Sequence, residues 1–82
     1  MKVKQVKAKP GYVLDLEFED GLEGELSIAD RLFGAMFEPL KNTEYFSQVR
    51  IDEYGVVCWP NGADLASDVL YNKVLENQEK AS

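Results

Sequence analysis

The sequence predicts an α+β fold: a small, mainly antiparallel sheet of two β-hairpins plus an N-terminal strand, with short connecting helical turns and a C-terminal helix packed on it. Three observations carry this prediction. Residues 12–18 and 22–28 alternate apolar with polar side chains, as half-buried strands do. Residues 48–52 and 56–59 flank a second loop that contains glycine. Residues 65–77 place apolar side chains at helical spacing.

The length of 82 residues suits one domain with a thin hydrophobic core, so we treat residues 1–82 as a single domain. A hydrophobic content of 45% is typical of a folded chain and not of a disordered one. Residues 77–82 are polar, and we expect this tail to fray.

Composition also limits where the protein can act. No apolar run approaches the roughly 20 residues of a membrane span, and the amino terminus lacks the apolar region of a secretory signal. A single cysteine cannot form an internal disulfide. We therefore expect a cytoplasmic protein that does not enter a membrane. The net charge of −6 disfavours direct binding to nucleic acid, because phosphate neutralisation requires clustered lysine and arginine.

The chain contains no histidine. This removes the Ser-His-Asp and Cys-His catalytic arrangements and the zinc sites with histidine ligands. The glycines do not match the spacing of phosphate-binding or dinucleotide-binding loops. We therefore expect no enzyme, no metal site and no cofactor.

The register of the first hairpin can be derived by parity. A loop of residues 19–21 sets Phe18 opposite Leu22 and Leu14 opposite Leu26, so that the two apolar faces coincide. The third loop residue is a glycine, which this loop type holds at positive φ.

The amino-terminal strand, residues 2–8, is expected to pair beside this hairpin. Val3 and Val6 are three residues apart, so both face the core only if a bulge or bend lies between them. Pro10-Gly11 then marks a turn.

Short elements are expected between the hairpins. Gly34 closes a helical turn over residues 30–34, and Pro39 excludes a long regular element. Asn42 is a good cap for a one-turn helix over residues 43–47, which would press an aromatic side chain onto the sheet.

The second hairpin repeats the parity argument. A loop of residues 53–55, again with glycine third, sets Ile51 opposite Val57 and Val49 opposite Trp59. The lone cysteine then lies on the other face, where no histidine activates it, and we expect it to be unreactive.

The C-terminal helix is expected to begin at Leu65 or Ala66 and to end near Asn77. Either Asp64 or Ser67 could cap it, and the sequence does not decide between them. Its buried stripe is Leu65, Val69, Leu70 and Val74, with Tyr71 as a further candidate.

Three motifs stand out along the chain. They are Phe18-Glu19-Asp20-Gly21, Met36-Phe37-Glu38-Pro39-Leu40-Lys41, and Trp59-Pro60-Asn61-Gly62-Ala63-Asp64 with Leu70-Tyr71 downstream. Together they resemble the bacterial domain-of-unknown-function family 2442 over almost the whole chain, and the tryptophan motif is the most specific of the three. The family commonly has a proline at the start of the helix, where this chain has Ser67.

The resemblance implies a small α+β domain whose members have no established activity. Some members are similar to the amino-terminal part of proteins that carry a helix-turn-helix afterwards. Others resemble small proteins encoded beside a second uncharacterised protein, which suggests by analogy a toxin–antitoxin pair.

The loop from Trp59 to Asp64 is the first candidate interaction site, with Trp59, Asn61 and Asp64 as its residues. Aromatic and turn residues on a scaffolded loop often bind partners. A structural role explains the same residues: the tryptophan fills the core, Asn61-Gly62 makes a turn, and the aspartate accepts backbone N–H bonds at the helix start.

Carboxylates on one face of the first hairpin are the second candidate. They are Asp15, Glu17, Glu23 and Glu25. The predicted register sets like charges directly opposite one another, and we expect Lys2 and Lys4 to neutralise them in part. A flat strand face disperses such ligands, which disfavours a calcium site. The open interpretations are a solvated face and a docking surface for a basic protein.

Three functional hypotheses follow. The first is a non-enzymatic protein-interaction module, and the second, a special case, is an antitoxin-like partner of a small basic protein. The third is a small ligand-binding or hydrolytic domain with a site near Trp59 and Asp64. Outward-facing Val13 and Val56, and any unpaired strand edge, leave room for a homodimer.

Overall fold

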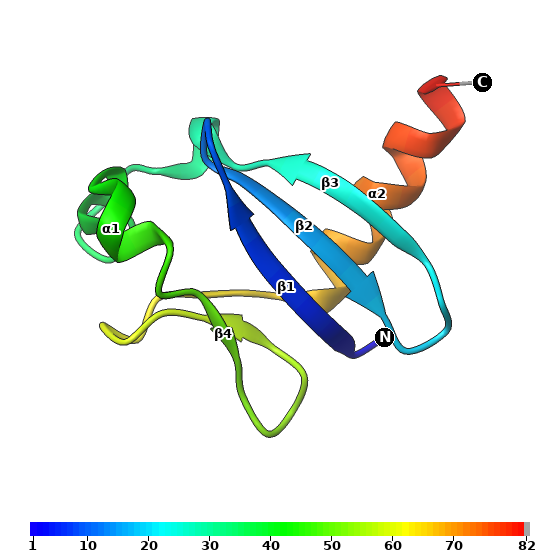
Figure 1. Ribbon diagram of the computed structural model, residues 1–82, viewed down its shortest axis with the longest axis horizontal. Helices are drawn as coiled ribbons and strands as arrows, with labels where there is room; N and C mark the ends of the chain where they lie inside the picture. Colours follow the sequence, from blue (N-terminus) through cyan, green and yellow to red (C-terminus); the bar gives the residue numbers. More distant parts are fainter. Residues whose placement is uncertain (82) are drawn as a thin grey trace.

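Over residues 1–81, the chain forms two three-stranded antiparallel sheets and one long helix, which confirms the α+β prediction (Figure 1). The computed structural model describes the backbone of residues 1–81 and the side chains of residues 1–78. The first sheet contains β1 (Val3–Lys9), β2 (Val13–Phe18) and β3 (Glu23–Ser27). The second contains β4 (Arg50–Ile51), β5 (Val57–Cys58) and β6 (Asp64–Leu65). The helical elements are η1 (Ala29–Arg31), η2 (Glu38–Lys41), α1 (Thr43–Phe46) and α2 (Ser67–Ala81).

The register of the first sheet is the one predicted by parity. Leu14 pairs with Leu26, and the Phe18 N–H donates to the carbonyl of Leu22 over 2.8 Å. Gly21, at φ 92°, closes the loop in the left-handed region. The apolar face formed by β2 is fully buried, because Leu14, Leu16 and Phe18 all lose their contact with solvent.

The predicted bulge in β1 is also present. The pairing with β2 shifts between Val3 and Gln5, so that Val3 lies opposite Phe18 while Val6 lies opposite Leu16. The shift keeps both valines on the core side, and it turns Lys7 and Lys9 toward the opposite, outer face.

Three of the hairpins share one loop form. Each loop has three residues, and the last is a glycine at positive φ. The residue before the loop donates its N–H to the carbonyl of the residue after the loop, and its own carbonyl accepts from the N–H of the glycine. The three loops end at Gly21, Gly55 and Gly62. The third loop joins β5 to β6, a strand that the sequence analysis did not predict. Its residues Asp64 and Leu65 were assigned instead to the approach and start of the helix.

The segment between the sheets follows the predicted pattern of short elements. Asn42 accepts hydrogen bonds from the N–H groups of Glu44 and Tyr45, which caps α1 as expected. The helix thereby fixes Phe46 in the core, with its ring centroid 5.5 Å from that of Tyr12 in an edge-on contact.

Helix α2 covers the apolar face of the first sheet and lies behind β2 and β3 in the view of Figure 1. Leu70 and Val74 are buried in this contact, as predicted, whereas Val69 is exposed, so its assignment to the buried stripe was wrong. The helix approaches closely because Gly24 has no side chain: a Cβ there would lie 2.7 Å from Cγ1 of Val74.

Both predicted ends of this helix need correction. It starts at Ser67, since Leu65 pairs with Val57 in β6. It continues to Ala81, past the predicted end at Asn77, and Ser82 lies outside the described residues. The side-chain amide of Gln78 donates to the carbonyl of Glu23 over 2.7 Å, which ties this turn of α2 to β3.

Candidate interaction surface

Trp59 occupies the centre of the core and not a surface. Its side chain is 1% exposed, and its indole N–H donates to the carbonyl of Phe46 over 2.9 Å. The ring also lies against that of Phe46, with centroids 5.9 Å apart. A tryptophan whose ring and N–H are both occupied in this way acts in packing.

Asn61 has two structural contacts. Its Oδ1 accepts from the N–H of Ala63 over 3.0 Å, which forms the turn, and its Nδ2 donates to the carbonyl of Met36 over 2.8 Å. Asp64 is exposed and belongs to β6, where it lies opposite Cys58 of β5. It therefore does not lie at the start of α2, where it was expected to cap the helix. The loop from Trp59 to Asp64 therefore serves mainly to hold the residues near Met36.

The four candidate carboxylates share the outer face of the first sheet, opposite the face that α2 covers. Glu17 lies opposite Glu23, and Asp15 lies opposite Glu25, as predicted. This group, Asp15, Glu17, Glu23 and Glu25, is called the carboxylate face below.

Lysines from β1 neutralise much of the carboxylate face. The ammonium of Lys4 lies 3.7 Å from Glu17, and Lys9 forms a close ion pair with Glu25. The hydrogen bond from Lys9 to Glu25, together with the attraction between their charges, raises the pKa of Lys9. Lys2, expected to take part, instead packs against Gly55. Lys4, at the bulge, takes part as predicted, and Lys9, beyond the bulge, takes part in place of Lys2.

An exposed apolar surface lies on the loop between η1 and η2. The side chains of Phe33 and Met36 are 72% and 45% exposed, which is unusual for residues of this size and polarity. A cavity of about 360 Å³ lies beside Phe33 and is lined by Arg31, Phe33, Phe37 and the buried Leu65 of β6. Phe33, Met36, Phe37 and Leu65 are called the Phe33 surface below.

The loop that carries this surface is held from two sides. Gly34, at φ 84°, accepts backbone hydrogen bonds from the N–H groups of Phe37 and Glu38. On the other side, Asn61 binds the carbonyl of Met36, and a Cβ on Gly62 would lie 3.3 Å from the Met36 methyl group. The exposed side chains thus project from a fixed backbone.

Two carboxylates lie next to residues of the Phe33 surface in the sequence. Glu38 follows Phe37 and Asp64 precedes Leu65, and both are exposed. Arg31 is the one cation that lines the cavity. The border of the surface is therefore more acidic than basic.

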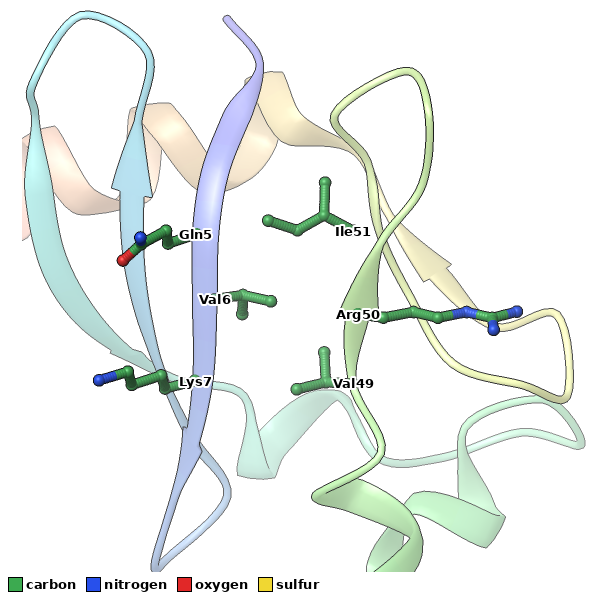
Figure 2. Close-up of a pocket in the computed structure, with 6 residues that line it drawn as sticks. All are labelled: Gln5, Val6, Lys7, Val49, Arg50 and Ile51. Atoms are coloured by element: carbon green, nitrogen blue, oxygen red, sulfur yellow. The ribbon is translucent and has the colours of Figure 1, made fainter.

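A groove of about 420 Å³ separates the two sheets where β1 faces β4 (Figure 2). Figure 2 shows Val6, Val49 and Ile51 directed into the groove, while Lys7 and Arg50 point away from it. The backbones come within 8 Å of each other there, which leaves no room for an added strand between them, because two strand spacings need about 9.5 Å. β1 is an edge strand of the first sheet, and its lysines and bulge are features that commonly prevent another strand from pairing with such an edge.

Asp20 and Tyr71 form the contact with the clearest electrostatic effect. The phenol O–H of Tyr71 donates to Asp20, which lowers the pKa of Asp20 and raises that of Tyr71. The Leu22 N–H also donates to Asp20 and lowers its pKa further. This pair fastens α2 to the first hairpin loop, away from the Trp59 loop.

Within the described residues, no group of three or more histidine, cysteine, aspartate or glutamate side chains is arranged to hold a metal ion. No helix in this part of the chain has both the length and the apolar character needed to cross a bilayer. The cysteine, Cys58, is free and half-buried.

Comparison with protein-family models assigns the chain to a family. The model of a protein family of unknown function, DUF2442, matches residues 3–76, which is nearly the whole chain. The chain belongs to the DUF2442 family. No curated protein and no solved structure matches it significantly. In this member of DUF2442, the matched region contains both sheets, the Phe33 surface and most of α2.

The sequence analysis did not identify Phe33 and Met36 as candidate functional residues. A signal was present: Leu32-Phe33 and Met36-Phe37 put four large apolar residues in a short irregular loop around Gly34. Such a loop cannot direct all of them inward, so some must be exposed.

Proposed function

We propose that this DUF2442 protein is a non-enzymatic interaction module that binds a basic segment of another protein at the Phe33 surface. The observation that supports it best is the 72% exposure of Phe33 beside an apolar cavity. Exposed apolar patches bordered by polar residues commonly mark interaction sites. The rigid attachment of the loop lowers the entropy lost when a partner binds.

The composition of the surface favours a protein partner. Aromatic residues, methionine and arginine are enriched at the centres of protein interfaces. The Phe33 surface contains Phe33 and Met36, and Arg31 lines its cavity. Aspartate and glutamate are depleted at interface centres, and the two carboxylates next to the surface in sequence, Glu38 and Asp64, do not belong to it.

Charge favours a basic partner. Two exposed carboxylates, Glu38 and Asp64, adjoin the surface in sequence, against the single guanidinium of Arg31 in the cavity lining, and the whole chain has a net charge of −6. Such a field accelerates association with positively charged proteins and opposes association with acidic ones. The carboxylate face contributes less than its sequence suggested, since Lys4 and Lys9 pair with two of its members.

An antitoxin-like role is a narrower form of this proposal, in which the bound protein is small, basic and harmful when free. The net charge of −6 supports it. A hydrolytic or ligand-binding site near Trp59 and Asp64 receives less support, because the tryptophan is fully engaged in the core and the carboxylate is exposed on a strand.

The test compares Phe33→Ser with Tyr54→Ser. Tyr54 is a suitable control because its side chain is 68% exposed and lies on the loop between β4 and β5. The parent and both variants are each used to capture binding proteins from a host lysate, and the captured proteins are identified and purified. Each purified partner is then titrated by calorimetry against the parent, Phe33→Ser and Tyr54→Ser. We expect a basic partner that binds the parent and Tyr54→Ser alike, and Phe33→Ser at least tenfold more weakly, as for an interface anchor residue.

Two outcomes would contradict the proposal. Equal binding of the partner to Phe33→Ser and to the parent would remove the surface from the interface. Self-association of the parent in sedimentation experiments, lost in Phe33→Ser, would assign the surface to a homodimer instead.

A further inference from the structure

A second cavity, of about 260 Å³, lies where the end of β3 meets η1 and α2. Of the residues that line it, only Arg31 also lines the cavity of the Phe33 surface. Leu26 and Leu70 are buried beneath it, whereas the rest of its lining is polar. Apart from Arg31, its lining is separate from that of the proposed protein interface, so it needs a separate explanation.

Hydrogen-bond donors from three elements converge on this cavity. Arg31 comes from η1, Lys73 and Asn77 come from α2, and Ser27 ends β3. Within the described part of the chain, none of these four side chains donates a hydrogen bond to another protein group, and neither cation has an ion-pair partner. Lys4 and Lys9 differ in this respect, because their charges are paired across the first sheet.

We infer that this cavity binds a small anion through a phosphate or carboxylate group. Arg31 is half-buried, so its planar guanidinium can present two N–H donors to such a group from a restricted position. Lys73 supplies a second positive charge from the helix. The volume lies below the roughly 300 Å³ at which sites for drug-sized ligands begin, so the ligand is an inorganic anion or a small anionic metabolite.

Asp30 limits the affinity of the site. Its carboxylate lines the same cavity and repels an anion, which leaves a net charge of about +1 from the three charged side chains. Asp30→Asn should therefore bind the anion more tightly, while removal of either cation should weaken binding. A specific site also requires that removal of a cation outside the cavity, such as Arg50, leaves binding nearly unchanged.

The experiment is a titration of the protein with inorganic phosphate, followed by amide chemical shifts at constant ionic strength. We expect saturable shifts at residues of β3, η1 and α2. Arg31→Gln and Lys73→Gln should each weaken binding roughly fivefold, the size of one exposed charge interaction, and Asp30→Asn should strengthen it by a similar factor. Arg50→Gln, which removes an exposed arginine on β4, serves as the matched control.

The inference is overturned if the shifts do not saturate, or if Arg50→Gln weakens binding as much as Lys73→Gln. A parallel titration with acetate identifies the group: tighter binding of phosphate assigns a phosphate site, and tighter binding of acetate assigns a carboxylate site. Phe33→Ser should bind phosphate like the parent, so this result is independent of the proposed protein interface.

Discussion

Two glycines show that a residue can be required by the backbone conformation alone or by close packing as well. Gly21 and Gly55 occupy the same place in two loops and both have positive φ, but their surroundings differ. A Cβ on Gly21 would meet no atom within 4 Å, whereas a Cβ on Gly55 would lie 2.6 Å from Cβ of Lys2.

We therefore predict that Gly21→Ala lowers the free energy of unfolding by about 1–2 kcal/mol, the usual cost of a left-handed residue with a side chain. Gly55→Ala should cost more, because it must also displace Lys2 near the start of β1. Urea denaturation of both variants measures the difference. Equal losses would mean that β1 moves aside at no cost.

Aromatic residues at the two extremes of exposure give a second prediction. Trp59→Phe removes the indole donor and leaves the buried carbonyl of Phe46 without this partner, which should cost about 1–3 kcal/mol. Phe33→Ser should change stability by no more than about 0.5 kcal/mol, because the side chain is exposed. A large loss of stability in Phe33→Ser, measured by urea denaturation, would show that this residue packs in solution.

At the scale of elements, the contact between β3 and α2 depends on Gly24. Gly24→Ala would force a methyl group against Val74 and should destabilise the fold by about 1–3 kcal/mol. Val74→Ala in the same chain removes the clashing Cγ1. The double variant should then lose less than the sum of the single losses, by about 0.5–3 kcal/mol. Strict additivity in a double-mutant cycle would contradict this contact.

The Asp20–Tyr71 contact joins α2 to the first loop in a pH-dependent way. The lowered pKa of Asp20 gives stability that is present above pH 3.8 and is lost as the pH falls through its folded pKa. The raised pKa of Tyr71 gives stability that is present below pH 10.0 and is lost as the pH rises through its folded pKa. The Tm difference between the parent and Tyr71→Phe should therefore be largest between these limits and shrink at both ends. A difference that does not vary with pH would exclude this linkage.

At the scale of the whole molecule, the alternation of apolar and polar side chains correctly predicted the strand registers. The registers of two hairpins followed from alternating side chains and a glycine in third position, and the bulge in β1 followed from the spacing of Val3 and Val6. The loop before β6 carries the same glycine signal. It was missed because Asp64 and Leu65 also fit the start of a helix, and a two-residue strand is too short to show its own period.

Site residues were harder to predict than registers, because exposure depends on tertiary contacts. Nothing in the sequence shows that Asn61 reaches Met36, 25 residues earlier, and so supports the loop beneath Phe33. Likewise, Lys4 was predicted to neutralise the carboxylate face, but the choice of Lys9 over Lys2 required knowing on which residue the bulge falls. Irregular segments have no period from which to infer the direction of a side chain.

The glycine-closed loops bear on how quickly the native state is reached. Each strand pairs within its sheet only with a strand that precedes or follows it along the chain, so no ladder has to wait for a distant segment. Proteins with such local connections reach their native state faster than those with long-range strand pairing. Refolding within milliseconds would therefore be expected, with the docking of α2 as the step that brings remote parts together.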